Sequence, residues 1–180
     1  MPLDDVLVML EGALRLRPEV INFFVNKRRV VELFSRCRQR GLEFRWVCTG
    51  RVDAVLSMDD DVLRFLRQAG LISVFFGIES GSSKILKLIN KGITPETALK
   101  LNVRLRQEGI TPHYSFMAGF PTETEEDVQK TMKLMHRLKW ENPQAVIWRL
   151  NQYTPYPGTE LFDLAVQHWF KPPERFEDWS

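Results

Sequence analysis

Cysteine and histidine are scarce in this sequence, and neither is spaced as a metal site would require. The two cysteines among 180 residues, Cys37 and Cys48, match no zinc, redox or cluster motif, so we expect both to be buried small apolar groups. The three histidines, His113, His136 and His168, are not spaced as metal ligands or as part of a catalytic pair. We therefore expect no metal bound by these side chains.

An excess of charge and a long apolar run are also lacking. Lys and Arg number 25 against 23 Asp and Glu, and the basic residues are spread along the chain, which argues against a dedicated nucleic-acid or membrane surface. No apolar run approaches the length of a membrane span, and residues 1–5 carry two acids where a secretory signal would carry Lys or Arg. These features predict a soluble, cytoplasmic protein without nucleic-acid or membrane partners.

Helical and strand patterns alternate along the chain. Helical spacing of apolar residues or helix-start signals mark residues 27–40, 58–69, 94–108 and 124–139, and β-rich runs lie at residues 43–48, 71–77, 114–118 and 145–150. Alternation of this kind implies parallel strands in one α/β domain. Three helices end in Arg-Gln-x-Gly, which places Gly41, Gly70 and Gly109 where a left-handed C-cap is wanted.

Several helix starts carry capping residues. Ser57 and Asp60 are placed as a variant of the capping box, and Thr94 precedes a proline at the first helical position. Thr122 or Thr124 is expected to cap the helix at residues 124–139. The last residues, 169–180, show no clear period and are expected to form a loop.

Periodicity alone leaves two folds open, a doubly wound sheet and part of a β/α barrel. In both, ligands bind at the carboxyl ends of the strands, so the residues after each apolar run are the informative ones. Three segments meet this condition, at residues 76–82, 116–124 and 153–159. Arg51 and Asp53 also follow a strand, although an ion pair at the surface explains them equally well.

The first segment places a carboxylate directly after a buried strand. Glu79 precedes a Gly/Ser turn rich in backbone donors and is suited to accept hydrogen bonds from a ribose diol. The alternative is that Glu79 lies before a helix that starts at Ser82 and Ser83, where the helix dipole favours an acid without any ligand. Spacing alone favours this second interpretation.

The other two segments have similar pairs of interpretations. In the second, Gly119 lets a flat ligand approach the backbone, but an ordinary capped loop between strand and helix explains the same residues. In the third, prolines and tyrosines suit a rigid wall for an adenine. A Pro-Gly turn with Thr159 capping a short helix that buries Leu161 and Phe162 is an equally good interpretation.

Taken together, the motifs resemble the radical S-adenosylmethionine (SAM) superfamily, in particular the branch with cobalamin-binding relatives such as the anaerobic magnesium-protoporphyrin IX monomethyl ester cyclases. The motifs are Phe76-Gly77-Ile78-Glu79-Ser80-Gly81-Ser82, Lys91-Gly92-Ile93-Thr94, Gly119-Phe120-Pro121-Thr122-Glu123-Thr124 and Pro155-Tyr156-Pro157-Gly158-Thr159. The resemblance covers about residues 22–162. It implies a partial (β/α)6 TIM-type barrel of parallel strands with outer helices, a single incomplete domain at residues 1–180 with a tail at 163–180.

The resemblance also implies a SAM site. By it, Glu79 would bind the ribose of SAM with Ser80 nearby, and the predicted cofactor-binding residues as a whole are Gly77, Glu79, Ser80, Met117, Gly119, Tyr153 and Pro155. Among these, the last four would line the pocket for the adenine. The implied partners are SAM, an unidentified small-molecule substrate, and the missing upstream part of the barrel or another chain.

Two departures from the family pattern limit what this chain is expected to do. The family's Cys-x3-Cys-x2-Cys motif, which ligates a [4Fe–4S] cluster in full-length relatives, is absent, and Val20 and Ile21 stand where relatives usually place an acidic pair. We therefore expect a fragment of a radical SAM enzyme that is inactive alone, with cobalamin a cofactor open to full-length relatives. Alternatives are a degenerate SAM-binding or partner-binding domain and, third, a radical SAM methylthiotransferase, whose members usually carry Gln at the position of Glu79.

Overall fold

The computed structural model describes residues 19–20, 24, 26–43 and 45–175, and its centre is a five-stranded sheet in the order β1-β2-β3-β4-β5. The strands are β1 (Glu19–Val20), β2 (Trp46–Thr49), β3 (Leu71–Glu79), β4 (Thr111–Ala118) and β5 (Val146–Gln152). Every neighbouring pair is parallel. Since the strand order follows the chain without reversing, the sheet is that of a β/α barrel and not of a doubly wound fold. The prediction of a partial barrel is confirmed.

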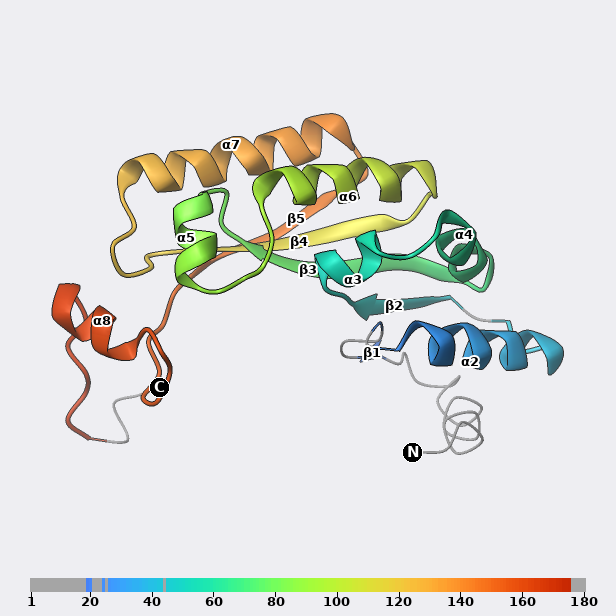
Figure 1. Ribbon diagram of the computed structural model, residues 1–180, viewed down its shortest axis with the longest axis horizontal. Helices are drawn as coiled ribbons and strands as arrows, with labels where there is room; N and C mark the ends of the chain where they lie inside the picture. The colour runs from blue at the N-terminus through green and yellow to red at the C-terminus, as the bar shows by residue number, and fades with distance from the viewer. Residues whose placement is uncertain (1–18, 21–23, 25, 44, 176–180) are drawn as a thin grey trace.

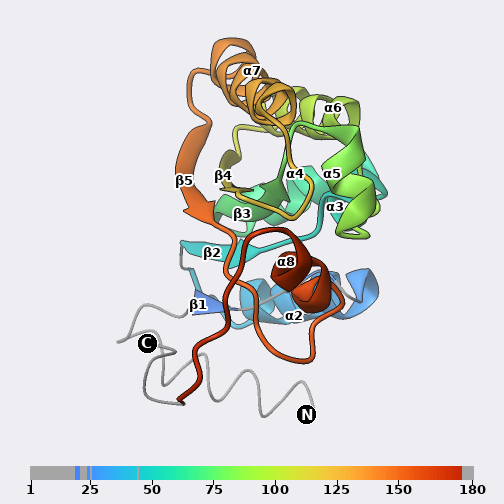
Figure 2. The ribbon, with the colours of Figure 1, turned by 90° about the vertical axis from the view of Figure 1, so that its left-hand side faces the viewer.

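Helices join the strands and lie along one side of the sheet. The described helices are α2 (Lys27–Gln39), α3 (Val52–Leu56), α4 (Asp60–Gln68), α5 (Ser83–Leu88), α6 (Pro95–Gln107), α7 (Glu125–Glu141) and α8 (Phe162–His168). Figures 1 and 2 show α6 and α7 lying side by side along the sheet, while α8 lies beyond the end of β5. The opposite side of β3, β4 and β5, which we call the inner face, carries no helix in these views.

Burial alternates along β3 because successive side chains point to opposite sides of a strand. Val74, Phe76 and Ile78 are buried toward the helices, and Phe75 lies half-buried on the inner face. Burying each such apolar side chain stabilises the fold by about 2 kcal/mol relative to leaving it exposed. The core therefore lies between the sheet and the helices, and the inner face is left for other contacts.

Local signals in the sequence correctly placed several helix ends. The Thr94 hydroxyl accepts a hydrogen bond from the Thr97 backbone at 3.3 Å, and α7 begins after Thr124, which caps it in the same way. At the other ends, Gly41, Gly70 and Gly109 have φ values of 67°, 96° and 66°, the left-handed conformation predicted for them. These features are local, so the chain forms them without help from the rest of the fold.

The predicted capping box before α4 is wrong. Ser57 instead ends α3, a short helix that the sequence analysis missed, and its hydroxyl donates to the Ala54 carbonyl at 2.9 Å. Helix α4 begins at Asp60 after Asp59, and Asp59 provides no side-chain cap. The Ser57 side chain is therefore occupied within α3 and is not available to α4.

The start of the last helix was also predicted wrongly. The Thr159 hydroxyl donates to the Tyr156 carbonyl at 2.7 Å and so closes a turn, while α8 starts at Phe162 without a side-chain cap. Leu161 and Phe162 are only half-buried, and Ala165 is the buried residue of this helix. Helix α8 thus occupies the first part of the predicted tail.

Other boundaries moved by a few residues, and some predictions lie outside the described part. Strand β2 begins at Trp46 instead of residue 43, and residues 171–175 contain no helix or strand, as expected for a loop. Residues 1–5, Ile21 and residues 176–180, on which other predictions depend, are not described. None of the described helices has the length and apolar character needed to cross a membrane.

Arg104 is expected to be important for the α3 region. Its guanidinium donates to the carbonyls of Val55 and Leu56, at 3.2 and 2.9 Å, and also to that of Met58, so it joins α6 to the carbonyl end of α3. Replacing it by Lys removes the fork of donors and should lower the free energy of unfolding by about 2 kcal/mol in urea denaturation. The matched change Arg137→Lys, at an exposed helix pair, should cost less than about 0.5 kcal/mol. Equal effects of both changes would contradict this role of Arg104.

Candidate functional site

Glu79 ends β3 in a backbone conformation that few residues other than glycine adopt. Its φ is 71°, and the Ser80 N–H donates to the Ile78 carbonyl at 3.0 Å across it, as in a γ-turn. The pairing of β3 with β4 shifts register between Gly77 and Glu79, so a bulge redirects the chain at this point. Strain of this kind is most often retained at functional sites, because it fixes where a side chain points.

Gly77 allows the Glu79 carboxylate to fold back over the strand. A Cβ atom at Gly77 would lie 2.3 Å from Glu79 Oε1, which is closer than any real contact, and 3.2 Å from Lys91 Nζ. The Lys91 ammonium donates to Glu79 Oε1 at 2.9 Å. Within the described part of the chain, no hydrogen bond to Glu79 Oε2 is found, so Lys91 holds one carboxylate oxygen while the other is left to accept from a ligand.

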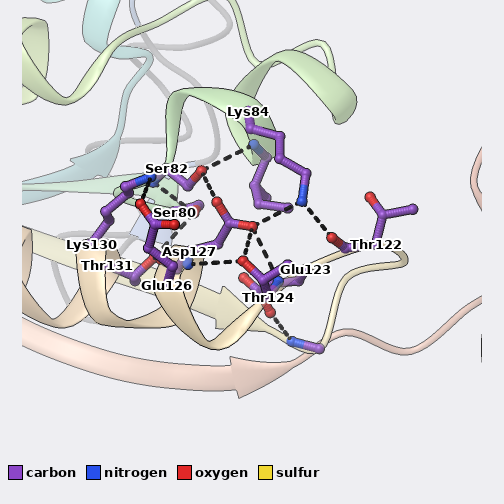
Figure 3. Close-up of polar contacts among 12 residues, drawn as sticks. Ser80, Ser82, Lys84, Thr122, Glu123, Thr124, Glu126, Asp127, Lys130 and Thr131 are labelled. Carbon is purple, nitrogen blue, oxygen red and sulfur yellow. Dashed lines mark hydrogen bonds and ion pairs between the residues drawn. The ribbon is translucent and has the colours of Figure 1, made fainter.

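The turn after Glu79 is bound to α7 by buried hydroxyl groups (Figure 3). The fully buried Ser80 hydroxyl lies 3.1 Å from the Thr131 hydroxyl, and the Gly81 N–H donates to that same Thr131 oxygen at 2.9 Å. The Ser82 N–H donates to the Ser80 hydroxyl at 3.0 Å. Ser80 therefore holds the turn after Glu79 to α7, and its predicted position near the ribose of SAM stays a prediction.

Asp127, in the first turn of α7, is the centre of these contacts. Its Oδ1 accepts from the Ser82 hydroxyl at 2.6 Å, and its Oδ2 accepts from Lys84 Nζ at 2.9 Å and from the Thr124 hydroxyl at 2.8 Å. These donors, Ser82 above all, hold the pKa of Asp127 well below its usual range, although burial acts in the opposite direction. We call Ser80, Ser82, Lys84, Thr124, Asp127 and Thr131 the α7 polar network.

The residues predicted to line the adenine pocket lie at the ends of β4 and β5. Gly119 follows β4 with φ 88°, and its N–H donates to Glu123 Oε2 at 2.5 Å. The Tyr153 N–H donates to the Ala118 carbonyl at 2.8 Å, and the rings of Phe120 and Tyr153 stack with centroids 5.0 Å apart. The segments after β4 and β5 are thereby held together.

All seven predicted residues therefore gather at the carboxyl edge of three neighbouring strands. Gly77, Glu79 and Ser80 lie at the end of β3, and Met117 and Gly119 at the end of β4, with Glu79 paired beside Phe116. Tyr153 and the buried Pro155 follow β5. No bound molecule tests their roles, which stay predictions.

The sequence analysis missed Asp127, Thr131 and Glu123 as parts of this site. Asp127 stands three residues after the cap Thr124, and its side chain accepts from the Thr124 N–H at 3.1 Å, so a capping-box pattern was readable there. Glu123 Oε1 is buried without a partner among the described residues. Thr131 carried no local signal, because its partners are about 50 positions away.

A pocket of about 360 Å³ opens on the inner face beside Glu79. It is lined by Thr49, Gly50, Arg51, Phe75, Phe76, Gly77, His113, Ser115 and Trp148. Arg51 forms the predicted pair with Asp53, with two contacts of 3.1 Å, and both side chains are exposed. Gly77 lines this pocket, and the Glu79 carboxylate lies over the same residue.

The residues present do not fit an iron–sulfur cluster. Cys37 and Cys48 are both buried, as predicted, and burial raises the pKa of Cys48 to about 12, which disfavours a thiolate ligand. Among the described residues, no three His, Cys, Asp or Glu side chains lie together as a metal site. The printed 180 residues contain no further cysteine.

Comparisons with a family model and with known protein sequences both find similarity over most of this chain. The model of the radical SAM superfamily matches residues 15–135, more than half of the chain. An uncharacterized methyltransferase of Pyrococcus horikoshii is 35% identical over 144 residues, which are 80% of this chain and 30% of that protein. The anaerobic magnesium-protoporphyrin IX monomethyl ester cyclase of Rubrivivax gelatinosus is 30% identical over 138 residues, 77% of this chain and 24% of the cyclase. The chain thus spans less than a third of the length of these relatives.

Solved structures show the same fold. The radical SAM methyltransferase TsrM of Kitasatospora setae, solved with cobalamin and a [4Fe–4S] cluster, superposes with a TM-score of 0.71 over 92% of this chain and 32% of its own, at 19% identity. At this identity the match concerns the fold alone. It agrees with the strand order of a β/α barrel derived above.

Proposed function

Because this chain belongs to the radical SAM superfamily, we propose that its sheet edge binds the adenosine part of SAM, with Glu79 accepting hydrogen bonds from the ribose hydroxyls. The observation that carries this proposal is the Glu79 carboxylate, which is folded over Gly77, held at one oxygen by Lys91 and left open at the other. Two vicinal hydroxyls are suitable donors to such a carboxylate.

The neighbouring residues receive roles that follow from their positions. Gly119 presents backbone without a side chain, Met117 precedes it by two residues, and Tyr153 and Pro155 follow the neighbouring strand β5, which suits the approach of a flat adenine. We assign Ser80 a positioning role, because its buried hydroxyl contacts α7 and so holds the turn that carries Glu79. The implied pocket is thus shared among the ends of β3, β4 and β5.

The complete family reaction is a proposal for a longer protein. In the family, a cluster supplies the electron that cleaves SAM, and these 180 residues do not supply its cysteine ligands. We therefore propose the family reaction only for a longer protein of which this chain would be part. Cobalamin, an unidentified small-molecule substrate and a cytoplasmic location likewise stay predictions, the first supported by what the solved relatives bind.

A comparison of two nucleosides tests the role of Glu79. The chain should bind 5′-deoxyadenosine about tenfold more tightly than 2′,5′-dideoxyadenosine in calorimetric titration, because the second lacks a ribose hydroxyl to donate to the carboxylate. Glu79→Ala should remove this preference, and Glu79→Gln should keep a reduced one.

A control variant separates the role of Glu79 in ribose binding from the effect of removing any carboxylate of the chain. Glu96→Ala, at an exposed position of α6, should bind both nucleosides as the unmodified chain does. Binding of both nucleosides without preference by the unmodified chain, or a full preference retained in Glu79→Ala, would exclude Glu79 as the ribose acceptor. Binding of neither nucleoside would refute the proposed adenosine site.

A further inference from the structure

We infer that the inner-face pocket binds a flat, mainly apolar molecule through a carboxylate or carbonyl oxygen, which His113 and Ser115 recognise. This inference rests on the proposed function, because it names the class of substrate that would lie beside the bound adenosine. The pocket volume of about 360 Å³ lies within the range of small-molecule sites.

Three rings from three adjacent strands form the pocket wall. Phe75 in β3 lies opposite His113 in β4, with ring centroids 4.3 Å apart, and Trp148 in β5 meets the Phe75 ring edge-on at 5.4 Å. The Trp148 side chain is 51% exposed although it is one of the largest apolar groups of the chain. Open aromatic surface of this kind favours stacking with a flat ligand.

His113 contributes a hydrogen-bonding group that nothing in the described part of the chain uses. Its Nδ1 atom is buried without a hydrogen-bond partner among the described residues, and its recorded contacts are the rings of Phe75 and Trp148. Burial lowers the pKa of His113, so the ring is neutral near pH 7. Because a proton on the buried Nδ1 would find no acceptor, the neutral ring carries its proton on Nε2 and can donate it to a ligand.

Ser115 stands two residues further along β4, on the same face of the strand. Its hydroxyl lines the pocket, and no hydrogen bond to it is found within residues 45–175. Thr49 and Arg51 also line the pocket, but His113 and Ser115 are the two that stand on β4 beside the rings, where they can bind a polar group of a ligand. If His113 served packing alone, its polar atoms would be expected to have partners.

The pocket adjoins the proposed ribose site. Gly77 lines the pocket, and the Glu79 carboxylate lies over Gly77, so the two sites share this residue. A molecule held at His113 and Ser115 would therefore lie next to the sugar of a bound adenosine. This contact agrees with a substrate position in an enzyme that acts through SAM.

Two naphthalene probes of similar shape test the inference. The chain should bind 2-naphthoate at least tenfold more tightly than 2-naphthylmethylammonium, since only the first offers an acceptor to His113 and Ser115 and a negative charge to Arg51, which also lines the pocket. His113→Phe keeps a flat ring and removes both nitrogens, so it should weaken 2-naphthoate binding several-fold without changing the unfolding midpoint, and the charge of Arg51 accounts for the preference that is left. His168→Phe, at an exposed position of α8, is the matched control and should keep the preference.

Nitrogen NMR of the imidazole provides a second readout. The Nε2–H tautomer is expected for His113 in the free chain, with a shift of its signals on addition of 2-naphthoate. Unchanged binding in His113→Phe, an Nδ1–H tautomer, or no binding of 2-naphthoate at about 1 mM would overturn the inference. If the chain prefers 5′-deoxyadenosine but does not bind 2-naphthoate, only this inference is refuted. If it binds 2-naphthoate as expected but binds neither nucleoside, the adenosine site is refuted and the ligand pocket is retained.

Discussion

Replacing Asp127 by alanine is expected to lower the free energy of unfolding of this chain by about 3 kcal/mol. The carboxylate is almost fully buried and accepts from Ser82, Lys84 and Thr124. Its removal leaves a buried hydroxyl and a helix-terminal N–H without an acceptor, and each unpaired buried group costs about 1–3 kcal/mol. The effect should appear as a lower urea midpoint with an unchanged dependence on urea concentration.

The stability that the α7 polar network contributes depends on pH in a predictable direction. The folded pKa of Asp127 is lowered, first by the Ser82 hydroxyl and then by Lys84 and Thr124, relative to an unfolded value of about 3.9. Ionised Asp127 therefore stabilises the fold fully above about pH 5, and this stabilisation is lost as pH falls through the lower folded pKa. The stability difference between the unmodified chain and Asp127→Asn should be constant near neutrality and shrink in acid.

A neighbouring residue provides the control for Asp127. Glu126 is exposed and pairs with Lys130 one turn along α7, so Glu126→Gln should change the unfolding free energy by less than about 0.5 kcal/mol. If Asp127→Ala were as mild as Glu126→Gln, or if the difference for Asp127→Asn grew in acid, the α7 polar network would not be a main source of stability at the site.

Adding one methyl group at Gly81 should destabilise the fold by about 3 kcal/mol. A Cβ atom there would lie 2.4 Å from the Lys130 carbonyl oxygen and 2.7 Å from the Thr131 Cα, and both atoms are backbone of α7. A side chain can turn aside, but the α7 backbone has to move as a whole, and it would carry Thr131 and Asp127 away from Ser80 and Ser82. Gly81→Ala should therefore also weaken the preference for 5′-deoxyadenosine, by releasing the turn after Glu79.

Gly41→Ala distinguishes crowding from backbone strain. Gly41 has no atom within 4 Å of its added Cβ but has φ 67°, so alanine there should cost only about 1 kcal/mol through conformation. Gly81 is not among the residues with positive φ, so the loss of unfolding free energy in Gly81→Ala should come from the clash with α7.

Amide hydrogen exchange gives a second measurement of this contact. The Gly81 N–H donates to the Thr131 hydroxyl, so its exchange should become faster in variants that loosen the contact. A smaller loss for Gly81→Ala than for Gly41→Ala would contradict this explanation.

The candidate site was only partly predictable from the sequence. Glu79, Gly77 and Gly119 were found because each follows an apolar run at a strand end, and the family resemblance then gave them roles. Asp127 was missed because its main partner Ser82 is 45 positions away. His113 received no role from the sequence, since the sequence does not show that the rings of Phe75 and Trp148 lie next to it.

The sequence by itself determined the features that depend on neighbours within about four positions. Thr94 and Thr124 begin helices, glycines such as Gly41 end them, and the alternation of apolar runs specifies parallel strands, because caps and periodicity act through local hydrogen bonds and burial. Tertiary structure alone decided the fold-back of Glu79 over Gly77, the contact of Asp127 with Ser82 and the ring wall of the inner face. These contacts depend on strand register and helix docking, including the bulge at Glu79, and a shift of one residue would turn each side chain to the opposite face.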